Sequence, residues 1–515
     1  MPLRCSVPRD SHLRSPSYAR SIALRCAAFV GLLMTDSSPF AVRASAAQDE
    51  TSPRPNIILI NADDLGFGEI GCYGQTSIET PHLDRMAREG MRFRNFYAGA
   101  TVCAPSRCTM MTGRHNGHAW VRGNAGADVS IQALREEEVT FAEVARDAGY
   151  RTALVGKWGL GDRVPGAESG LPDRQGFDFF FGYLNQVHAH NHFPAFLWRD
   201  DQQVRLRNEV VEVGNRYAGF VGGYATKRID YAQDLLMDEA IGWLETVGED
   251  PFLLVLAPTI PHANNEGTRG TGNGQEVPSL GNYADRDWSE QDKGQAAMIT
   301  WLDSGVGRLL DHLKASGLDR RTIVLFTSDN GPHAEGGRDT SRFVPAGPLR
   351  GKKRDLYEGG IRVPLIVWGP GRIEAGQATD QIGYHGDLMA TIGEWVQRTI
   401  PTDCDSVSLV PTLEGRPSEQ QQHRFLYWEF YEQGGRQAVR FGRWKAIREP
   451  MLTGPIELYD LQTDLGESSD VAAAHPDLVR QATDFMDQAH QPNPNWVPRG
   501  TTPAKPVPGH GRMPF

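Results

Sequence analysis

The sequence predicts an α/β protein with a large, doubly wound mixed sheet flanked by helices. Short runs that are apolar on both faces recur between residues 56 and 368, which is typical of buried parallel strands. Segments with apolar residues three or four positions apart lie between these runs, as in amphipathic helices. After about residue 400, strand-like segments follow one another, which indicates a smaller C-terminal α+β subdomain with an antiparallel sheet.

The elements of the larger part alternate along the chain. Strand-like runs occupy residues 56–61, 153–155, 252–257, 322–326 and 363–368. Helical patterns occupy residues 140–148, 226–247 and 296–313. Ligands of doubly wound sheets bind beyond the carboxyl ends of the strands, so the residues that follow each strand are candidates for a site.

The C-terminal part has its own pattern. Residues 425–431, 438–447 and 457–461 resemble antiparallel strands, and residues 476–489 resemble a helix. Prolines recur from residue 492 onward, which predicts an extended tail. We therefore expect a large domain over residues 52–400 that carries the site, an α+β subdomain over 401–490 and a proline-rich tail over 491–515.

The N-terminus resembles a signal peptide over residues 1–47. Five arginines precede a short apolar segment at residues 26–34, and Ala-Ser-Ala at 44–46 offers a cleavage site. The apolar segment is too short to span a bilayer, and no later run of 18 apolar residues follows. We expect an exported protein, periplasmic or secreted, without stable membrane insertion; the alternative is a disordered tail.

Composition narrows the class of function. The net charge of −11 disfavours nucleic acid as a partner, although a local basic pocket can still bind an anionic substrate. Six cysteines in 515 residues are too few for a disulfide scaffold, and no Cys-x-x-Cys pair indicates a zinc ribbon.

Carboxylates follow two of the predicted strands. Asp63 and Asp64 come directly after the first strand, and Asp329 and Asn330 follow the strand at 322–326. An Asp-Asp pair after a strand is usually a helix cap or a turn. Two such sites at the same edge of a sheet would instead form an oxygen-rich shell suited to Ca²⁺ or Mg²⁺ and unsuited to zinc.

Residues 103–107 read Cys-Ala-Pro-Ser-Arg, and residues 111–114 read Met-Thr-Gly-Arg. This resembles the signature of type I, formylglycine-dependent sulfatases, the arylsulfatase-like members of the alkaline phosphatase superfamily, with methionine in place of a leucine. The resemblance implies that a formylglycine-generating enzyme oxidises Cys103 to 3-oxoalanine. One hydroxyl of the hydrated aldehyde then attacks sulfur to form a covalent sulfo-enzyme intermediate, and the other expels sulfate.

The same resemblance implies the other roles. One Ca²⁺, rather than Mg²⁺, is expected, and its ligands come from five positions: Asp63, Asp64, Cys103, Asp329 and Asn330. Arg107 orients the nucleophile, and Lys157 matches the family's first lysine. His262 and Lys353 are the candidates to protonate the leaving oxygen. Because Lys352 is adjacent to Lys353, the match to the family's second lysine could be shifted by one residue. The structural alternative for each cation is a solvated or capping residue.

One position departs from the family pattern. The family motif Gly-Lys-Trp-His-Leu-Gly has a histidine where this chain has Gly159. A subgroup of bacterial sulfatases carries the same glycine together with a Gln-x-x-Ala-His motif that matches His190, which is our candidate replacement. His115 and His118 are weaker candidates. Nearby aromatic residues could stack on sugar rings or belong to the core: Tyr183, Phe193 and Trp198.

The sequence therefore predicts a sulfuric ester hydrolase acting on a sulfated small molecule or glycan. Two alternatives remain open at this stage. One is a phosphoester or phosphonate hydrolase of the same superfamily, and the other is a non-catalytic protein that binds sulfated glycans.

Overall fold

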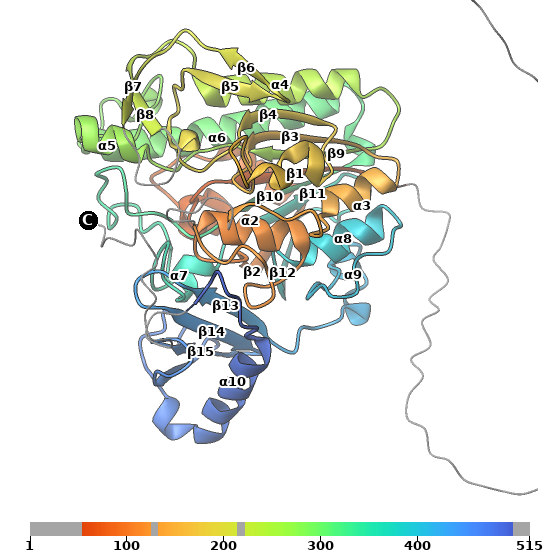
Figure 1. Cartoon of the computed structure of the whole chain (residues 1–515), viewed down its shortest axis with the longest axis vertical. Coiled ribbons are helices and arrows are strands. Elements are labelled where there is room, and N and C mark those ends of the chain that lie inside the picture. Colours follow the sequence, from red (N-terminus) through yellow and green to blue (C-terminus); the bar gives the residue numbers. More distant parts are fainter. Residues whose placement is uncertain (1–53, 125–131, 214–221, 498–515) are drawn as a thin grey trace, which may run out of the picture. The chain divides into compact units, whose positions relative to one another are not determined.

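The computed structural model describes residues 54–124, 132–213 and 222–497. The predicted signal peptide and most of the predicted tail lie outside these residues. The centre is a ten-stranded sheet, which confirms the predicted mixed α/β fold (Figure 1). In sheet order its strands are β12 (Gln377–Tyr384), β2 (Met91–Tyr97), β11 (Leu365–Trp368), β10 (Thr322–Ser328), β1 (Asn56–Ala62), β9 (Phe252–Ala257), β3 (Arg151–Lys157), β4 (Phe179–Tyr183), β5 (Phe196–Arg199) and β6 (Gln202–Arg205).

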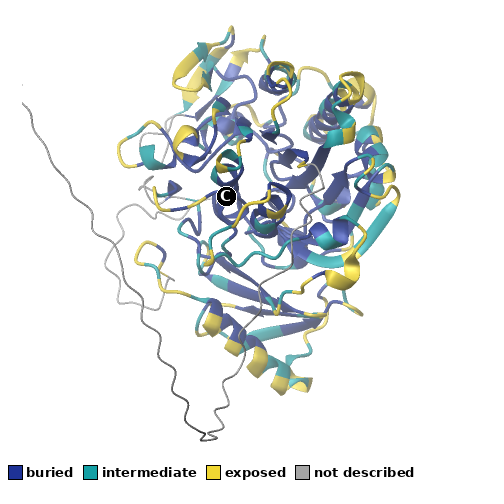
Figure 2. Cartoon of the chain, turned by 90° about the vertical axis from the view of Figure 1, so that its right-hand side faces the viewer, coloured by how far each residue is buried: buried dark blue, intermediate teal, exposed yellow. Residues whose placement is uncertain are grey.

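Helices cover both faces of this sheet (Figure 1). On β1, Ile57 and Leu59 face one apolar core, and Ile58 and Ile60 face the other. The first core contains residues of α2 (Cys103–Thr112), α3 (Phe141–Asp147), α8 (Asp387–Trp395) and α9 (Val410–Leu413). The second contains residues of α1 (Pro81–Arg88), α4 (Ala232–Thr246) and α6 (Glu290–Ala315). Burial of the central strands on both faces, visible in Figure 2, explains why their sequences are continuously apolar.

Parallel pairing in the middle of the sheet sets the position of the site. Strand β1 pairs in parallel with β10 and β9, and β9 pairs in parallel with β3. Ala62 lies opposite Ser328, so the residues after β1 and β10 leave the sheet side by side. The carboxyl ends of these four strands therefore share one edge.

Three predicted elements differ in the structure. The run at 363–368 was expected to be a parallel strand, but β11 is antiparallel to both β10 and β2. It is apolar on both faces because it lies inside the sheet, whatever its direction. The predicted helix at 226–247 begins only at Ala232, since residues up to Lys227 form β8 (Gly222–Lys227), paired with β7 (Glu209–Val213). The predicted strand at 438–447 is a hairpin that turns at Gly442, where φ is +56°.

The hairpin belongs to a second, four-stranded antiparallel sheet, as predicted. Its strands are β13 (Leu426–Phe430), β14 (Arg436–Phe441), β15 (Trp444–Arg448) and β16 (Ile456–Asp460). Helix α10 (Pro476–Ala489) packs on one face, and the other face packs against Tyr97 and Val102 of the larger part. The boundaries predicted at residues 400 and 490 stay predictions.

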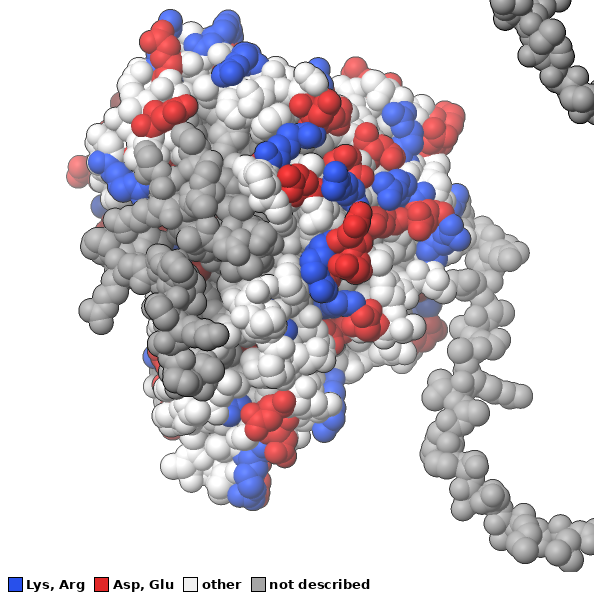
Figure 3. Space-filling model, viewed as in Figure 1, with Lys and Arg blue, Asp and Glu red and all other residues white. Residues whose placement is uncertain are grey.

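The described residues also include two short α-helices: α5 (Asn265–Thr271) and α7 (Glu358–Ile361). Among the described residues, none of the helices is both long and apolar enough to cross a lipid bilayer. On the face shown in Figure 3, acidic and basic side chains are interspersed.

A buried ion cluster joins the small sheet to the large part. Lys445 on β15 has no exposed surface, and its Nζ lies 3.0 Å from Glu358 Oε1 and 2.9 Å from Glu467 Oε1. Glu358 begins α7 and also pairs with Arg362. Removing the lysine would leave two buried carboxylates without their shared cation, so this contact is expected to matter for stability.

We predict that Lys445→Met lowers the free energy of unfolding by about 3–5 kcal/mol, because breaking a buried ion pair leaves uncompensated charge. Urea unfolding of the purified protein measures this change. The matched control is Lys227→Met, which removes the exposed pair with Glu209 and should change stability by less than about 1 kcal/mol. Equal effects of the two substitutions would contradict the predicted role of the cluster.

Candidate active site

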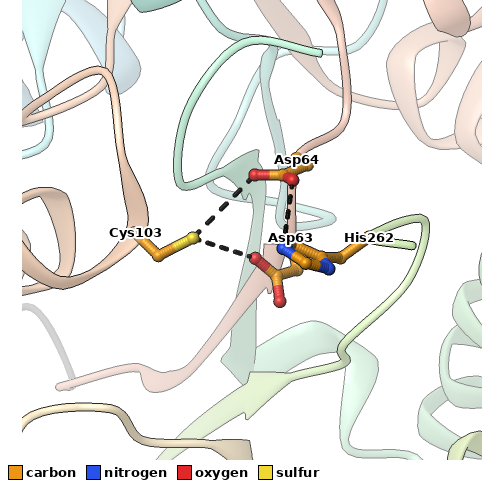
Figure 4. A group of neighbouring side chains, drawn as sticks. All are labelled: Asp63, Asp64, Cys103 and His262. Atoms are coloured by element: carbon orange, nitrogen blue, oxygen red, sulfur yellow. Dashed lines mark hydrogen bonds and ion pairs between the residues drawn. The ribbon is translucent and has the colours of Figure 1, made fainter. Parts of the chain in front are cut away.

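The shared edge of the four parallel strands carries a compact polar cluster. Cys103 Sγ lies 3.5 Å from Asp63 Oδ1 and 3.9 Å from Asp64 Oδ1 (Figure 4). His262 approaches the same group, with Nε2 3.5 Å from Asp64 Oδ2. Their potential ligand atoms all lie within 4.8 Å of one another. The structure thus brings together residues that are up to 199 positions apart in the chain, from Asp63 to His262.

Local structure places Cys103 at the start of α2. Val102 is extended and Cys103 is the first helical residue, so its side chain projects from the helix end. The Asn124 Oδ1 accepts the Ala104 N–H at 3.1 Å and satisfies one free donor of this end. The Ser106 hydroxyl donates to the Asp329 carbonyl, which ties α2 to the residue after β10.

Asp64 adopts a left-handed backbone conformation, with φ of +66°. This conformation is strained for a residue with a side chain and needs support from its surroundings. Its N–H donates to Asp329 Oδ1 at 3.1 Å, and its Oδ1 accepts from Asn330 Nδ2 at 2.6 Å. The turn after β1 is therefore held by the turn after β10, and the Asp64 carboxylate points towards Cys103.

Each of the three carboxylates has a cationic partner. Lys157 Nζ lies 2.7 Å from Asp63 Oδ2, and Lys353 Nζ lies 2.7 Å from Asp64 Oδ2. Arg107 donates Nε at 3.0 Å and Nη2 at 2.8 Å to Asp329 Oδ2. All six side chains are buried. The cluster is therefore balanced, with three negative and three positive groups.

The pairing shifts the pKa values of these groups. Burial is the largest single effect and disfavours the charged form of both lysines. Their acidic neighbours together outweigh it and raise both pKa values, with Asp63 contributing most at Lys157 and Asp64 contributing most at Lys353. Burial, together with Asp329, raises the pKa of the Cys103 thiol well above its usual value. As a plain thiol, Cys103 is therefore neutral in this pocket.

The donor set fits a hard divalent cation. The Asn330 Oδ1 is buried and has no hydrogen-bond partner among the described residues, although its Nδ2 is fully used. A metal ion would satisfy this oxygen. The Asp64 carboxylate contacts the same amide through Nδ2 and also contacts Cys103, while the Asp64 N–H bonds the Asp329 carboxylate. The imidazole of His262 is less suitable as a ligand, because its Nδ1 bonds the Ala263 carbonyl and its Nε2 contacts Lys353.

A second histidine stacks on His262. The ring centroids of His190 and His262 are 4.8 Å apart, and the rings are within 8° of parallel. His190 Nδ1 lies 2.9 Å from Glu266 Oε2, so Glu266 fixes the orientation of its ring. Burial lowers the pKa of His262 well below its usual value, and Lys353 lowers it further. His262 is therefore a neutral acceptor for the Lys353 ammonium.

The structure explains what occupies the space beside Gly159. The φ of Gly159 is +81°, and a Cβ atom there would lie 2.2 Å from Gln186 Nε2. Gln186 lies in the segment that ends at His190, and its Nε2 is 3.4 Å from the Gly159 carbonyl oxygen. The side chain of Gln186 thus fills the position where a side chain at residue 159 would begin.

Of the remaining candidates, some reach the cluster around Cys103 and others lie away from it. Lys353 reaches the cluster, whereas Lys352 is exposed. His115 and His118 stack on each other and approach Asp405, and no described contact joins them to Cys103. The aromatic residues near His190 are mostly structural: Tyr183 and Phe193 are buried in the cores, and Trp198 is half-buried beside Phe196 and Arg163.

Three contributing residues were missed by sequence reasoning. Glu266 orients His190, and Glu335 Oε2 lies 3.6 Å from Lys353 Nζ. His385 contacts the Ser106 hydroxyl at 3.2 Å. His385 follows β12, so the rule that polar residues after strands form sites could have found it. Glu266 lies in the short helix α5 and Glu335 lies in a loop, and no sequence motif around either residue indicated a role in the site.

Comparison with known proteins agrees with this geometry. The Sulfatase family matches residues 55–397, and the family described as N-sulphoglucosamine sulphohydrolase, C-terminal, matches residues 351–490. The chain is 32% identical to human (Homo sapiens) arylsulfatase A, over 87% of this chain and 92% of that protein. It is 28% identical to the N-acetylgalactosamine-6-O-sulfatase of Bacteroides thetaiotaomicron, over 85% and 93%.

A solved structure shares the fold. The crystal structure of Ps i-CgsB in complex with k-i-k-neocarrahexaose superposes with a TM-score of 0.70 at 24% identity and covers 87% of this chain and 96% of that one. The family match covers well over half of the chain, and it includes the strand ends that carry Asp63 and Asp329 and the helix start that carries Cys103. The chain therefore belongs to the sulfatase family and is an arylsulfatase-like sulfuric ester hydrolase.

Proposed function

We propose that this protein removes sulfate esters from sulfated carbohydrates, using a formylglycine made from Cys103 and one bound Ca²⁺. The observation that carries the proposal is the position of Cys103, at a helix start and facing three carboxylate–cation pairs. When hydrated, formylglycine supplies two hydroxyls on one carbon, one for attack on sulfur and one for release of sulfate. Arg107 holds Asp329 and α2 in register, which keeps residue 103 aimed at the cluster.

Asp63, Asp64, Asp329 and Asn330 would hold the cation, together with residue 103. Bound there, Ca²⁺ supplies positive charge that favours an ionised hydroxyl and draws a sulfate oxygen into the site. Its charge would also neutralise part of the carboxylate charge that Lys157, Lys353 and Arg107 otherwise neutralise. The N–H groups of the lysines would then be available to the equatorial sulfate oxygens, where charge gathers during transfer.

The Lys353–His262 pair and His190 are placed to transfer protons. Lys353 and His262 contact each other at 3.1 Å, and Lys353 is charged, so the pair can deliver a proton to the leaving oxygen. His190, held by Glu266, would take the part of the histidine that Gly159 replaces. Gln186 cannot accept a proton, so it is assigned a packing role beside Gly159.

The substrate class follows from relatives whose names specify a sulfated sugar. One of these is the N-acetylgalactosamine-6-O-sulfatase of Bacteroides thetaiotaomicron. We extend sulfated carbohydrates to this chain as the substrate class, with export to the periplasm or medium and maturation by a formylglycine-generating enzyme. A nucleic-acid substrate is disfavoured by the net charge of −11.

The nucleophile is tested with Cys103→Ser. Serine offers one hydroxyl, so this variant should release at most one equivalent of alcohol and then stop, while the wild type turns over repeatedly. Stopped assays of alcohol and of free sulfate, with 4-nitrophenyl sulfate as substrate, measure both steps. Cys404→Ser, a half-buried cysteine outside the site, is the control and should keep full activity.

Full turnover by Cys103→Ser would exclude the formylglycine route. Release of phosphate from 4-nitrophenyl phosphate without release of sulfate would favour a phosphoester hydrolase. Binding of a sulfated sugar by the matured wild type without any release would favour a non-catalytic binding protein.

The metal is tested by thermal unfolding of chelator-treated protein. Ca²⁺ at about 100 times its dissociation constant should stabilise the fold by about 2.7 kcal/mol, seen as a rise in Tm. Asn330→Ala removes the unpartnered amide oxygen and should abolish most of that rise, whereas Asn282→Ala, an exposed residue bonded to Glu79, should preserve it. A full Ca²⁺-induced rise in Asn330→Ala would contradict the assignment of this ligand.

A further inference from the structure

A line of charged side chains connects the buried cluster to the surface. Lys353 Nζ, bound to Asp64, lies 3.6 Å from Glu335 Oε2, and Glu335 Oε1 lies 2.6 Å from Arg354 Nη1. Arg354 Nε in turn lies 3.9 Å from Glu432 Oε2. The exposed fraction of these side chains rises outward, from 3% for Lys353 to 20%, 25% and 32% for the next three. The line therefore marks one wall between the reacting centre and solvent.

Arg354 is held in this wall by both parts of the molecule. Its φ is +78°, a strained conformation for arginine. Its N–H donates to the Thr101 carbonyl at 3.1 Å, two residues before Cys103, and its own carbonyl accepts from Arg436 Nη1 at 3.1 Å. Arg436 begins β14, and Glu432 lies in the turn before it. The small sheet thus supplies one acidic group of the wall and fixes the backbone of another member.

The position of the wall indicates which part of a substrate it meets. Under the proposed function, Lys353 protonates the leaving oxygen, so the alcohol must project from Lys353 towards solvent. Glu335 comes first in that direction and is already paired with Lys353 and Arg354, and Arg354 and Glu432 follow it. A guanidinium donates to hydroxyl oxygens and a carboxylate accepts from hydroxyl hydrogens, so neighbouring groups of this kind suit the vicinal hydroxyls of a sugar. The charge of Arg354 is offset by Glu335 and Glu432, which makes a second anionic group a poorer ligand.

We propose that Arg354 and Glu432 form a leaving-group subsite that binds hydroxyl groups of the sugar ring bearing the sulfate. The inference rests on the proposed function, because it assigns the alcohol to the Lys353 side of the site. The C-terminal sheet then takes part in substrate selection as well as in stability.

The test compares two substrates in the same variants. N-acetylgalactosamine 6-sulfate has ring hydroxyls next to the ester-bearing arm, and 4-nitrophenyl sulfate has none. Arg354→Lys and Glu432→Gln should each lower kcat/KM for the sugar at least tenfold further than for the aryl ester, mainly through KM. Arg443→Gln, which breaks the partly buried pair with Asp460 on the same sheet, should leave both values unchanged.

A second measurement, of ligand binding, does not require the conversion of Cys103 to formylglycine. In a Cys103→Ala background with Ca²⁺ present, the two substitutions should weaken binding of the sulfated sugar at least tenfold and binding of inorganic sulfate less than threefold, by calorimetry. Equal losses for both substrates, or for both ligands, would overturn the subsite. Failure of the wild type to hydrolyse either ester would count against the proposed function, and the binding ratio would still decide the subsite.

Discussion

The site depends on the mutual neutralisation of six buried charges. Carboxylates and cations lose several kcal/mol each when they leave water, and only close pairing with good hydrogen bonds offsets this cost. Asp63, Asp64 and Asp329 are each paired within 3 Å with Lys157, Lys353 and Arg107, respectively. Loss of one member leaves its partner buried and unpaired. The same balance lets the site accept a dication and an anionic ester together without gaining a large net charge.

The sheet makes this balance possible because its central strands are parallel and in register. The residues after β1 and β10 emerge together, and β3 ends at Lys157 on the same edge. The turn of Asp64 is strained, but its hydrogen bonds to Asp329 and Asn330 hold it. Strand pairing therefore sets the relative positions of the residues at the strand ends. Loops and the turn before β14 of the small sheet add Lys353, Glu335 and Glu432 from further along the chain.

Much of this could be predicted from the sequence, for identifiable reasons. The apolar runs located the central strands, and the polar residues after two of them located the carboxylates. Strand direction could not be read from β11, because burial on both faces gives the same pattern for either direction. The residues that support the site were invisible for another reason. Glu266, Glu335 and Glu432 owe their positions to tertiary contacts, and nothing in their local sequence distinguishes them from ordinary surface carboxylates.

The proposed mechanism depends most directly on the chemical state of residue 103. Mass spectrometry of the tryptic peptide 95–107, from protein made in its native host, measures that state. We predict an aldehyde or its hydrate in place of the thiol. An unmodified thiol in that material would contradict the proposed mechanism, even if the charge pairs around Cys103 bound calcium and sulfate.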